Sequence, residues 1–425
     1  MFSETQYTDV SLYALPKLDF DGIYAGGLMD LQNIININTN DATKGAAGKF
    51  GANINQIAIA RILKAYIYWT ITDRWGDVPY SQALKGDSSL TPKYDKQEDI
   101  YKDLVKELAE AKNQFTNSGP VTGDIVYYKP STSTIPWADA VKKWKKFANS
   151  LRMLITLRTS KVYPNAGDWA ATNFAAAYND ADGYIATNAD NFVVNYPGNV
   201  TAFKNPWYNL YDGRTDYAES KLMTDLMASL NDPRQAAFGS SSVGFPYGLK
   251  RDDAVAFGNA NGYAKVLADS KRTANAPLVI IGAADVLLAI AEAAQRGWIS
   301  TGVAASNYQA GVQASWAQWG VSSDITAYMA NANVALTGAA SDLQKIQLQQ
   351  YIAWYPDGTQ AWANWRRTGI PVLTPTPNAV NAGGKIPRRY TYGNNEYSVN
   401  VASVTEASSR IGGDTPDTKV WWDKP

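Results

Sequence analysis

Residues 54–80 read INQIAIARILKAYIYWTITDRWGDVPY, and this stretch decides the fold. Its first part is apolar almost all round, and beyond the first turn it carries only Arg61 and Lys64 as charges before its end. A helix that is hydrophobic on every face is a buried one. Gly76 and Pro79 then interrupt the helical pattern. The stretch therefore predicts a deeply buried helix that ends in a tight turn.

Helical patterns continue on both sides of this buried stretch. We expect Asn55 to cap its start, and Pro277 to occupy the first turn of a later helix, where its missing N–H costs nothing. Helix pairs joined by short turns favour hairpins of the tetratricopeptide type, although no strict 34-residue repeat is visible. Apolar residues at helical spacing predict helices near 27–37, 98–115, 137–159, 167–178, 218–230, 277–298, 301–319 and 341–355.

The predicted fold class is therefore mainly all-α, with tetratricopeptide-like hairpins and a loop-rich variable half. We expect residues 1–425 to form a single domain. A helical scaffold is predicted over about 50–160 and 277–356, with an insert over about 160–276 that is rich in Asn, Asp, Gly, Pro, Tyr and Trp. Such an aromatic and polar insert is where a binding surface is expected. The segment 368–425 is predicted to be irregular.

Composition excludes several classes of function. The chain has 39 basic and 39 acidic residues and so has no net charge that would hold nucleic acid. It contains no cysteine and no histidine, which excludes disulfides, thiolate or histidine metal sites and histidine-dependent triads. We therefore expect no cofactor and no metal. The longest apolar stretch, 276–291, is too short to span a bilayer and contains Asp285.

Carboxylate catalysis stays open, because glycoside hydrolysis needs only two Asp or Glu residues. Asp285 and Glu292 are seven residues apart and are predicted to share one face of a helix. We expect them to pair with basic groups or to cap helices instead. No phosphate loop, dinucleotide fingerprint or nucleophile elbow occurs. The preferred prediction is a protein that is not an enzyme, with no catalytic residues.

The aromatic residues favour a function in ligand binding. The chain has 26 Tyr and 14 Trp, whose flat apolar faces and polar edges suit contacts with sugar rings. The densest group is 205–214, where Trp207, Tyr208, Tyr211 and Arg214 are our candidate ligand-binding residues. The alternative is that Trp207 and Tyr211 anchor this loop to the core. The cluster 354–365 is predicted to be core packing.

Five segments, in order along the chain, resemble one known family. They are ARILKAY…DRWGDVPY over 60–80, WKKFANSLR over 144–152, AADVLLAIAEA with RGW over 283–298, WANWRRTGIPVLT over 362–374, and IPRRY over 386–390. The set is similar to the SusD/RagB family of nutrient-binding outer-membrane lipoproteins of Bacteroidetes.

This resemblance implies a tetratricopeptide-like helical scaffold and a cell-surface protein that binds oligosaccharides. It also implies delivery of the nutrient to a SusC-like TonB-dependent transporter and a lipid anchor on an N-terminal cysteine, which we expect to have been removed or to lie outside this chain. By position, the ligand surface of the family draws on Asn36–Asn40, so Asn38 and Asn40 join the candidates. The alternatives are a helical glycoside hydrolase with a carboxylate pair, or a ligand-free scaffold that binds proteins.

Overall fold

The computed structural model describes residues 1–14, 18–129 and 135–425, and most of their regular structure is helical. The prediction of a mainly all-α fold is confirmed. Contacts divide the chain into two compact units, each built from several segments. Unit 1 comprises Met1–Leu15, Ala186–Gln295 and Ser300–Pro387, and unit 2 comprises Pro16–Ile185, Arg296–Ile299 and Arg388–Pro425.

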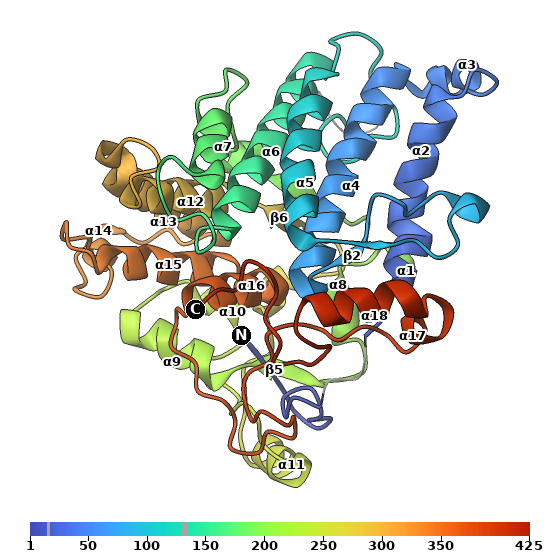
Figure 1. Ribbon diagram of the computed structural model, residues 1–425. Helices are drawn as coiled ribbons and strands as arrows, with labels where there is room; N and C mark the ends of the chain where they lie inside the picture. The colour runs from blue at the N-terminus through green and yellow to red at the C-terminus, as the bar shows by residue number, and fades with distance from the viewer. Residues whose placement is uncertain (15–17, 130–134) are drawn as a thin grey trace. The chain divides into compact units, whose positions relative to one another are not determined.

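Unit 2 is built around the predicted buried helix, α4. Helices α2, α4, α5, α6 and α7 pack in that order, each against the next, as expected of helical hairpins (Figure 1). A short antiparallel pair, β2 with β3, follows the turn after α4. The elements are α1 (Asp21–Ile23), α2 (Met29–Thr39), α3 (Lys44–Ala47), α4 (Asn53–Trp75), β2 (Val78–Pro79), β3 (Tyr94–Asp95), α5 (Gln97–Asn113), α6 (Trp137–Arg158), α7 (Trp169–Tyr178), α17 (Glu396–Val399) and α18 (Val401–Arg410).

The end of α4 is held by residues from the far end of the sequence. Gly76 ends the helix with a φ of 86°, which only glycine adopts without strain. Arg389 is fully buried and donates from Nε and Nη2 to the carbonyl oxygen of Trp75, at 3.2 and 2.9 Å. The last carbonyls of a helix lack intrahelical partners, so a cation there satisfies them and complements the helix dipole. Two of the five family-like segments thus stabilise each other.

Unit 1 contains the later helical hairpins. α12 packs against α13 and α15, and α15 packs against α16. Glu292 of α12 and Arg367 of α16 form a buried bidentate ion pair, with N···O distances of 2.6 and 2.7 Å. The helices are α8 (Pro206–Leu210), α9 (Lys221–Leu230), α10 (Gln235–Phe238), α11 (Arg251–Ala260), α12 (Ala283–Gln295), α13 (Ala304–Trp319), α14 (Thr326–Met329), α15 (Asp342–Ala353) and α16 (Gly358–Thr368).

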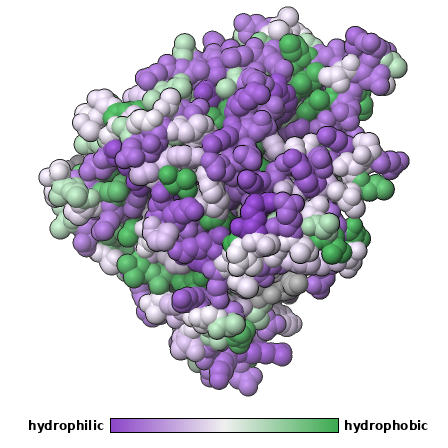
Figure 2. All heavy atoms as spheres, viewed as in Figure 1, coloured by the Kyte–Doolittle hydropathy of each residue, from purple (hydrophilic) through white to green (hydrophobic). Residues whose placement is uncertain are grey.

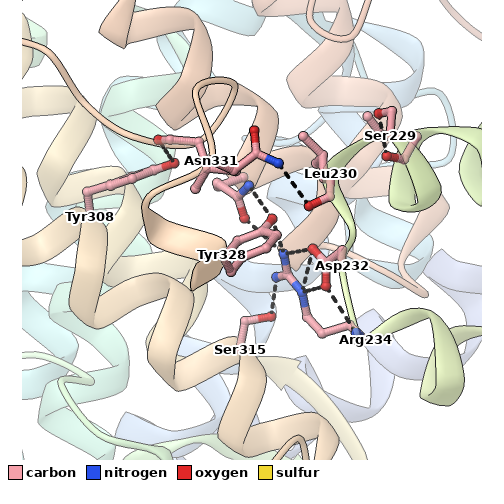
Figure 3. Close-up of polar contacts among 11 residues, drawn as sticks. Ser229, Leu230, Asp232, Arg234, Tyr308, Ser315, Tyr328 and Asn331 are labelled. Atoms are coloured by element: carbon pink, nitrogen blue, oxygen red, sulfur yellow. Dashed lines mark hydrogen bonds and ion pairs between the residues drawn. The ribbon is translucent and has the colours of Figure 1, made fainter. Parts of the chain in front are cut away.

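The loop-rich part of unit 1 is tied to these helices by a buried arginine. Arg234 has no exposed surface and bonds the Asp232 carboxylate through Nε at 2.9 Å. Its other nitrogens donate to Ser315 of α13 at 2.8 Å and Gln349 of α15 at 2.9 Å, and to the hydroxyl of Tyr328 (Figure 3). Two antiparallel strand pairs complete the unit: β1 (Phe2–Glu4) with β5 (Tyr217–Glu219), and β4 (Phe192–Val194) with β6 (Leu278–Ile281).

Several predicted element boundaries were wrong. The run after Pro277 forms strand β6 rather than the first turn of a helix, because Leu278–Ile281 is rich in β-branched residues that suit a strand. Asn55 lies inside α4 and does not cap it; its side chain instead donates to carbonyls of Ser118 and Gly119. α11, α16 and α18 lie in segments for which the sequence predicted no helix.

Hydrophilic residues cover most of the face shown in Figure 2, with hydrophobic residues scattered in small groups. Among the described residues, no helix combines the length and the apolar character needed to cross a bilayer.

Candidate functional site

A pocket of about 450 Å³ opens in unit 1 where strand β6, the start of α12 and the connection between α15 and α16 meet. Segments from the beginning, the middle and the end of the unit contribute to it. Its lining consists of Phe2, Trp207, Leu278, Val279, Ile280, Asp285, Gln318, Ala353, Trp354, Tyr355, Pro356, Asp357, Gly358 and Thr359.

Aromatic rings form one side of this pocket. The ring of Phe2 lies 5.3 Å from that of Trp207 and 5.7 Å from that of Tyr355, tilted against both. Tyr355 is itself fixed, because its ring stacks on Phe238 at 4.2 Å and its hydroxyl donates to the carbonyl of that residue at 2.5 Å. Rings held at such angles offer apolar faces of fixed orientation, which lowers the entropy lost when a flat ligand binds.

Trp207 is positioned by α8, of which it is the second residue. Asn205 caps α8, and its side-chain oxygen accepts a hydrogen bond from the Trp207 N–H at 2.8 Å. The side-chain nitrogen of Asn205 donates to the carbonyl of Ala276 at 2.9 Å. This asparagine therefore joins α8 to the segment that leads into strand β6. Trp207 remains partly exposed, so its ring is accessible to a ligand.

The polar side of the pocket carries two carboxyl groups. Asp357 caps α16, where one of its oxygens accepts from the backbone N–H groups of Thr359 and Gln360, both at 3.0 Å. Asp285 accepts from the Gly282 N–H at 2.8 Å through Oδ2. The pKa of Asp285 is raised to about 8, mainly by burial and in smaller part by the nearby Asp357, against the lowering effect of the Gly282 hydrogen bond. Among the described residues that line the pocket, none is a Lys or an Arg.

Of the candidates predicted from the sequence, Trp207 lines the pocket and its neighbours do not. Tyr211 is an anchor: its hydroxyl donates to the carbonyl of Tyr217 and accepts from the Val266 N–H, at 2.8 and 2.9 Å. The ring of Tyr208 lies against the Lys204 ammonium, 5.0 Å away. Arg214 is mostly exposed and pairs with Asp216. Within the cluster over 205–214, Trp207 therefore lies at the pocket, whereas Tyr211 anchors the loop.

Asn38 and Asn40 belong to unit 2, where both have local structural roles. Asn38 is buried, donates to the carbonyl of Ile34 at 2.8 Å and accepts from the side chain of Asn53 at 2.7 Å. Asn40 ends α2, and its side chain accepts from the Ala42 N–H at 2.8 Å. Their role in binding stays a prediction.

Among the described lining residues, only Trp207 was a predicted binding residue, and three of the others show why they were missed. Phe2 is separated from Trp207 by about half the chain, so no local pattern links them. Asp357 precedes a glycine and a threonine, and an aspartate before such residues is a signal for the start of a helix that could have predicted α16. Asp285 was noted only as half of a carboxylate pair. The other half, Glu292, is fully engaged with Arg367, as the ion-pair interpretation expected.

A second pocket, of about 510 Å³, lies in unit 2 near the end of the chain. Its charged groups are of both signs, and Arg410 there pairs with Asp77 at 2.6 Å. Within the described ranges, no group of three or more acidic side chains is arranged to hold a metal ion. The unit 1 pocket is therefore the better candidate for a binding site, because it joins accessible rings to buried polar groups.

The comparisons with known proteins agree with the resemblance seen in the sequence. A solved chitin-binding SusD homologue from Flavobacterium johnsoniae is 26% identical, with a TM-score of 0.83, and the match covers 100% of this chain and 91% of that one. Another structure, described as a chitin-binding protein, is 29% identical with a TM-score of 0.82, covering 100% and 92%. A SusD homologue from Bacteroides uniformis is 26% identical with a TM-score of 0.81, again covering 100% and 92%.

No protein with a curated description matches the chain. A family model does, over residues 1–393, and its description is "Starch-binding associating with outer membrane". Because this match spans most of the sequence, and the solved relatives share the fold over its whole length, the chain belongs to the SusD-like family.

Proposed function

We propose that this chain is a glycan-binding protein without enzymatic activity, and that the pocket of unit 1 holds its ligand. The observation that carries the proposal is the meeting of Phe2, Trp207 and Tyr355 with buried polar groups in one accessible pocket. Apolar ring faces suit the C–H faces of sugars, and a few fixed polar groups select among hydroxyl patterns. The family description and the two chitin-binding relatives support a carbohydrate ligand.

The glycan is expected to be a β-linked polymer fragment of the chitin type, as for those relatives. Titration calorimetry with chitin oligosaccharides tests this directly. Trp207→Ala removes one ring face and should weaken binding by about tenfold, close to 1.4 kcal/mol, which is within the usual worth of an aromatic contact. The control is Phe50→Ala, which removes a 62% exposed ring in unit 2 and should leave affinity unchanged. A broad panel of oligosaccharides that produces no heat would overturn the proposal.

We further propose that the protein acts at the cell surface of the outer membrane, anchored by lipid, and passes its ligand to a TonB-dependent transporter. The family's association with the outer membrane supports this location. Purification from membranes with the transporter of the same gene cluster tests the partnership. A chain that never copurifies with that transporter, with or without oligosaccharide, would contradict it.

A further inference from the structure

Asp357 brings an acidic side chain to the aromatic side of the unit 1 pocket. It lines the pocket and is half-buried, in the connection between α15 and α16. The next residue, Gly358, lies directly against the ring of Phe2, because a Cβ at position 358 would be 3.2 Å from Cε2 of that ring. The Phe2 ring in turn lies 5.3 Å from the ring of Trp207. The acid and the ring faces therefore adjoin in one part of the pocket.

The position of Asp357 suits a negative charge. Its Oδ1 accepts from the N–H groups of Thr359 and Gln360 at the start of α16, where the helix dipole favours an anion. The charge also acts across the pocket: the pKa of Asp285 is raised mainly by burial and in smaller part by Asp357. A carboxylate has about four acceptor positions. Helix capping through Oδ1 is thus compatible with a second role for this charge.

The charges of the described lining all have one sign. Asp285 and Asp357 are its acidic residues, and none of the described lining residues is a Lys or an Arg. The remaining polar side chains, which include Gln318 and Thr359, are neutral. A cleft that is lined by one sign of charge between apolar walls concentrates ligands of the opposite sign. The pocket therefore favours a cationic ligand over an anionic one.

We propose that the unit 1 pocket takes a β-linked glycan that carries a protonated amine, and that Asp357 is the specificity-determining residue that pairs with this ammonium group. This inference rests on the proposed glycan-binding function. An amino sugar matches both features of the pocket, because the C–H face of its ring suits Trp207 and Phe2, and its ammonium group suits the acid beside them. A chitin-type chain that has lost acetyl groups is such a ligand.

Three oligosaccharides of equal length and the same β-linkage test the effect of charge. They differ only at carbon 2 of each sugar, which bears an ammonium group in glucosamine, an acetamido group in N-acetylglucosamine and a hydroxyl group in glucose. Calorimetry at about pH 6 keeps the amine protonated. We expect the wild type to bind the glucosamine oligomer about tenfold more tightly than either neutral oligomer. This preference should shrink when the salt concentration rises from about 0.05 M to about 0.5 M.

Two variants remove the charge and keep the helix cap. Asp357→Asn and Asp357→Ser both retain a side-chain oxygen for the start of α16, and Asn and Ser cap helices about as well as Asp. Each should lose most of the preference for the glucosamine oligomer and bind the neutral oligomers within about threefold of the wild type. Circular dichroism verifies that both variants fold.

The matched control is Asp324→Asn. Asp324 also belongs to unit 1 and accepts from the Thr326 N–H at 2.9 Å at the start of a helix, but it is exposed and is not among the described lining residues of the pocket. This variant changes the net charge by the same amount and should bind all three oligomers as the wild type does.

Other outcomes overturn the inference. A wild type that binds the glucosamine oligomer no more tightly than the neutral ones, or Asp357 variants that keep the preference, would exclude a pairing with Asp357. An Asp324→Asn variant that loses the preference to the same extent would show that overall charge causes it. If Trp207→Ala weakens the binding of a neutral oligomer while the wild type shows no preference for the amine, the inference fails and the proposed function stands. If no oligosaccharide binds the wild type, both fail.

Discussion

At the residue scale, the family-like segments belong mainly to the scaffold, and Asp285 is the one described residue of the pocket lining that lies in them. Arg389 of the IPRRY segment bonds the last carbonyl of α4, and Glu292 of α12 pairs with Arg367 of the WANWRRT segment. Buried charges of this kind tolerate little substitution, because removing one partner leaves the other uncompensated. This explains why those segments indicated the fold from the sequence more clearly than they indicated the ligand.

The Glu292–Arg367 pair therefore makes a stability prediction. Arg367→Ala leaves the fully buried Glu292 without its cation and should lower the free energy of unfolding by about 3–5 kcal/mol. Lys221→Ala is the matched control, since its pair with Asp225 is more than half exposed and should contribute less than about 0.5 kcal/mol. Urea denaturation measures the free energy of unfolding of both variants. Equal decreases would show that the buried pair contributes no more to stability than the exposed one.

The site itself was only partly predictable from the residues. Trp207 stood out because aromatic and polar residues cluster around it, and it does line the pocket. Tyr211 belongs to the same cluster and is an anchor, because its hydroxyl finds backbone partners at Tyr217 and Val266. The local sequence cannot distinguish a binding aromatic residue from an anchoring one. The contacts and the exposure of each side chain depend on residues far away in the sequence, such as Phe2.

At the element scale, helices with long apolar patterns were predicted well, and shorter elements were predicted poorly. α4, α5 and α6 begin and end within a few residues of the predicted positions. β6 was mistaken for the start of a helix, because a short apolar run reads the same in either structure and only its pairing with β4 decides. α16 was not predicted as a helix, since its cluster of tryptophans was read only as core.

The packing of α13 against α12 gives the prediction at this scale. Gly311 of α13 faces Leu288 of α12, and a Cβ at position 311 would lie 2.7 Å from Cγ of that leucine and 3.2 Å from its backbone nitrogen. Gly311→Ala should therefore force the helices apart and destabilise the protein by about 1–3 kcal/mol. Gly302→Ala, where the nearest atom is 3.7 Å away, is the control. A thermal midpoint unchanged in both variants would contradict this packing.

At the scale of the whole molecule, each compact unit is assembled from segments distant in sequence. The pocket of unit 1 needs strand β1, helix α8 and the α15–α16 connection together. Helical periodicity alone cannot predict such a site, because the periodicity reports which face of an element is buried and not which elements meet. The resemblance over about 60–390 indicated which elements meet in the fold, and the contacts show which elements meet at the pocket.

Two buried acids in unit 1 make overall stability depend on pH. Burial raises the pKa of Asp285 from 3.8 to about 8 and that of Glu219 from 4.5 to about 7. The folded protein therefore binds more protons than the unfolded chain between these values, so these groups make stability fall as pH rises from about 4 to about 8. Each group contributes on the order of 3–6 kcal/mol, because one pKa unit corresponds to about 1.4 kcal/mol.

Asp285→Asn removes one of these titrations and should flatten the fall, leaving the variant more stable than the wild type near pH 8. The exposed Asp87→Asn is the control and should leave the profile unchanged. Urea denaturation across the range measures both. A wild-type stability that rises steadily to pH 8, with no gain from Asp285→Asn, would mean that the carboxyl is ionised in the folded state.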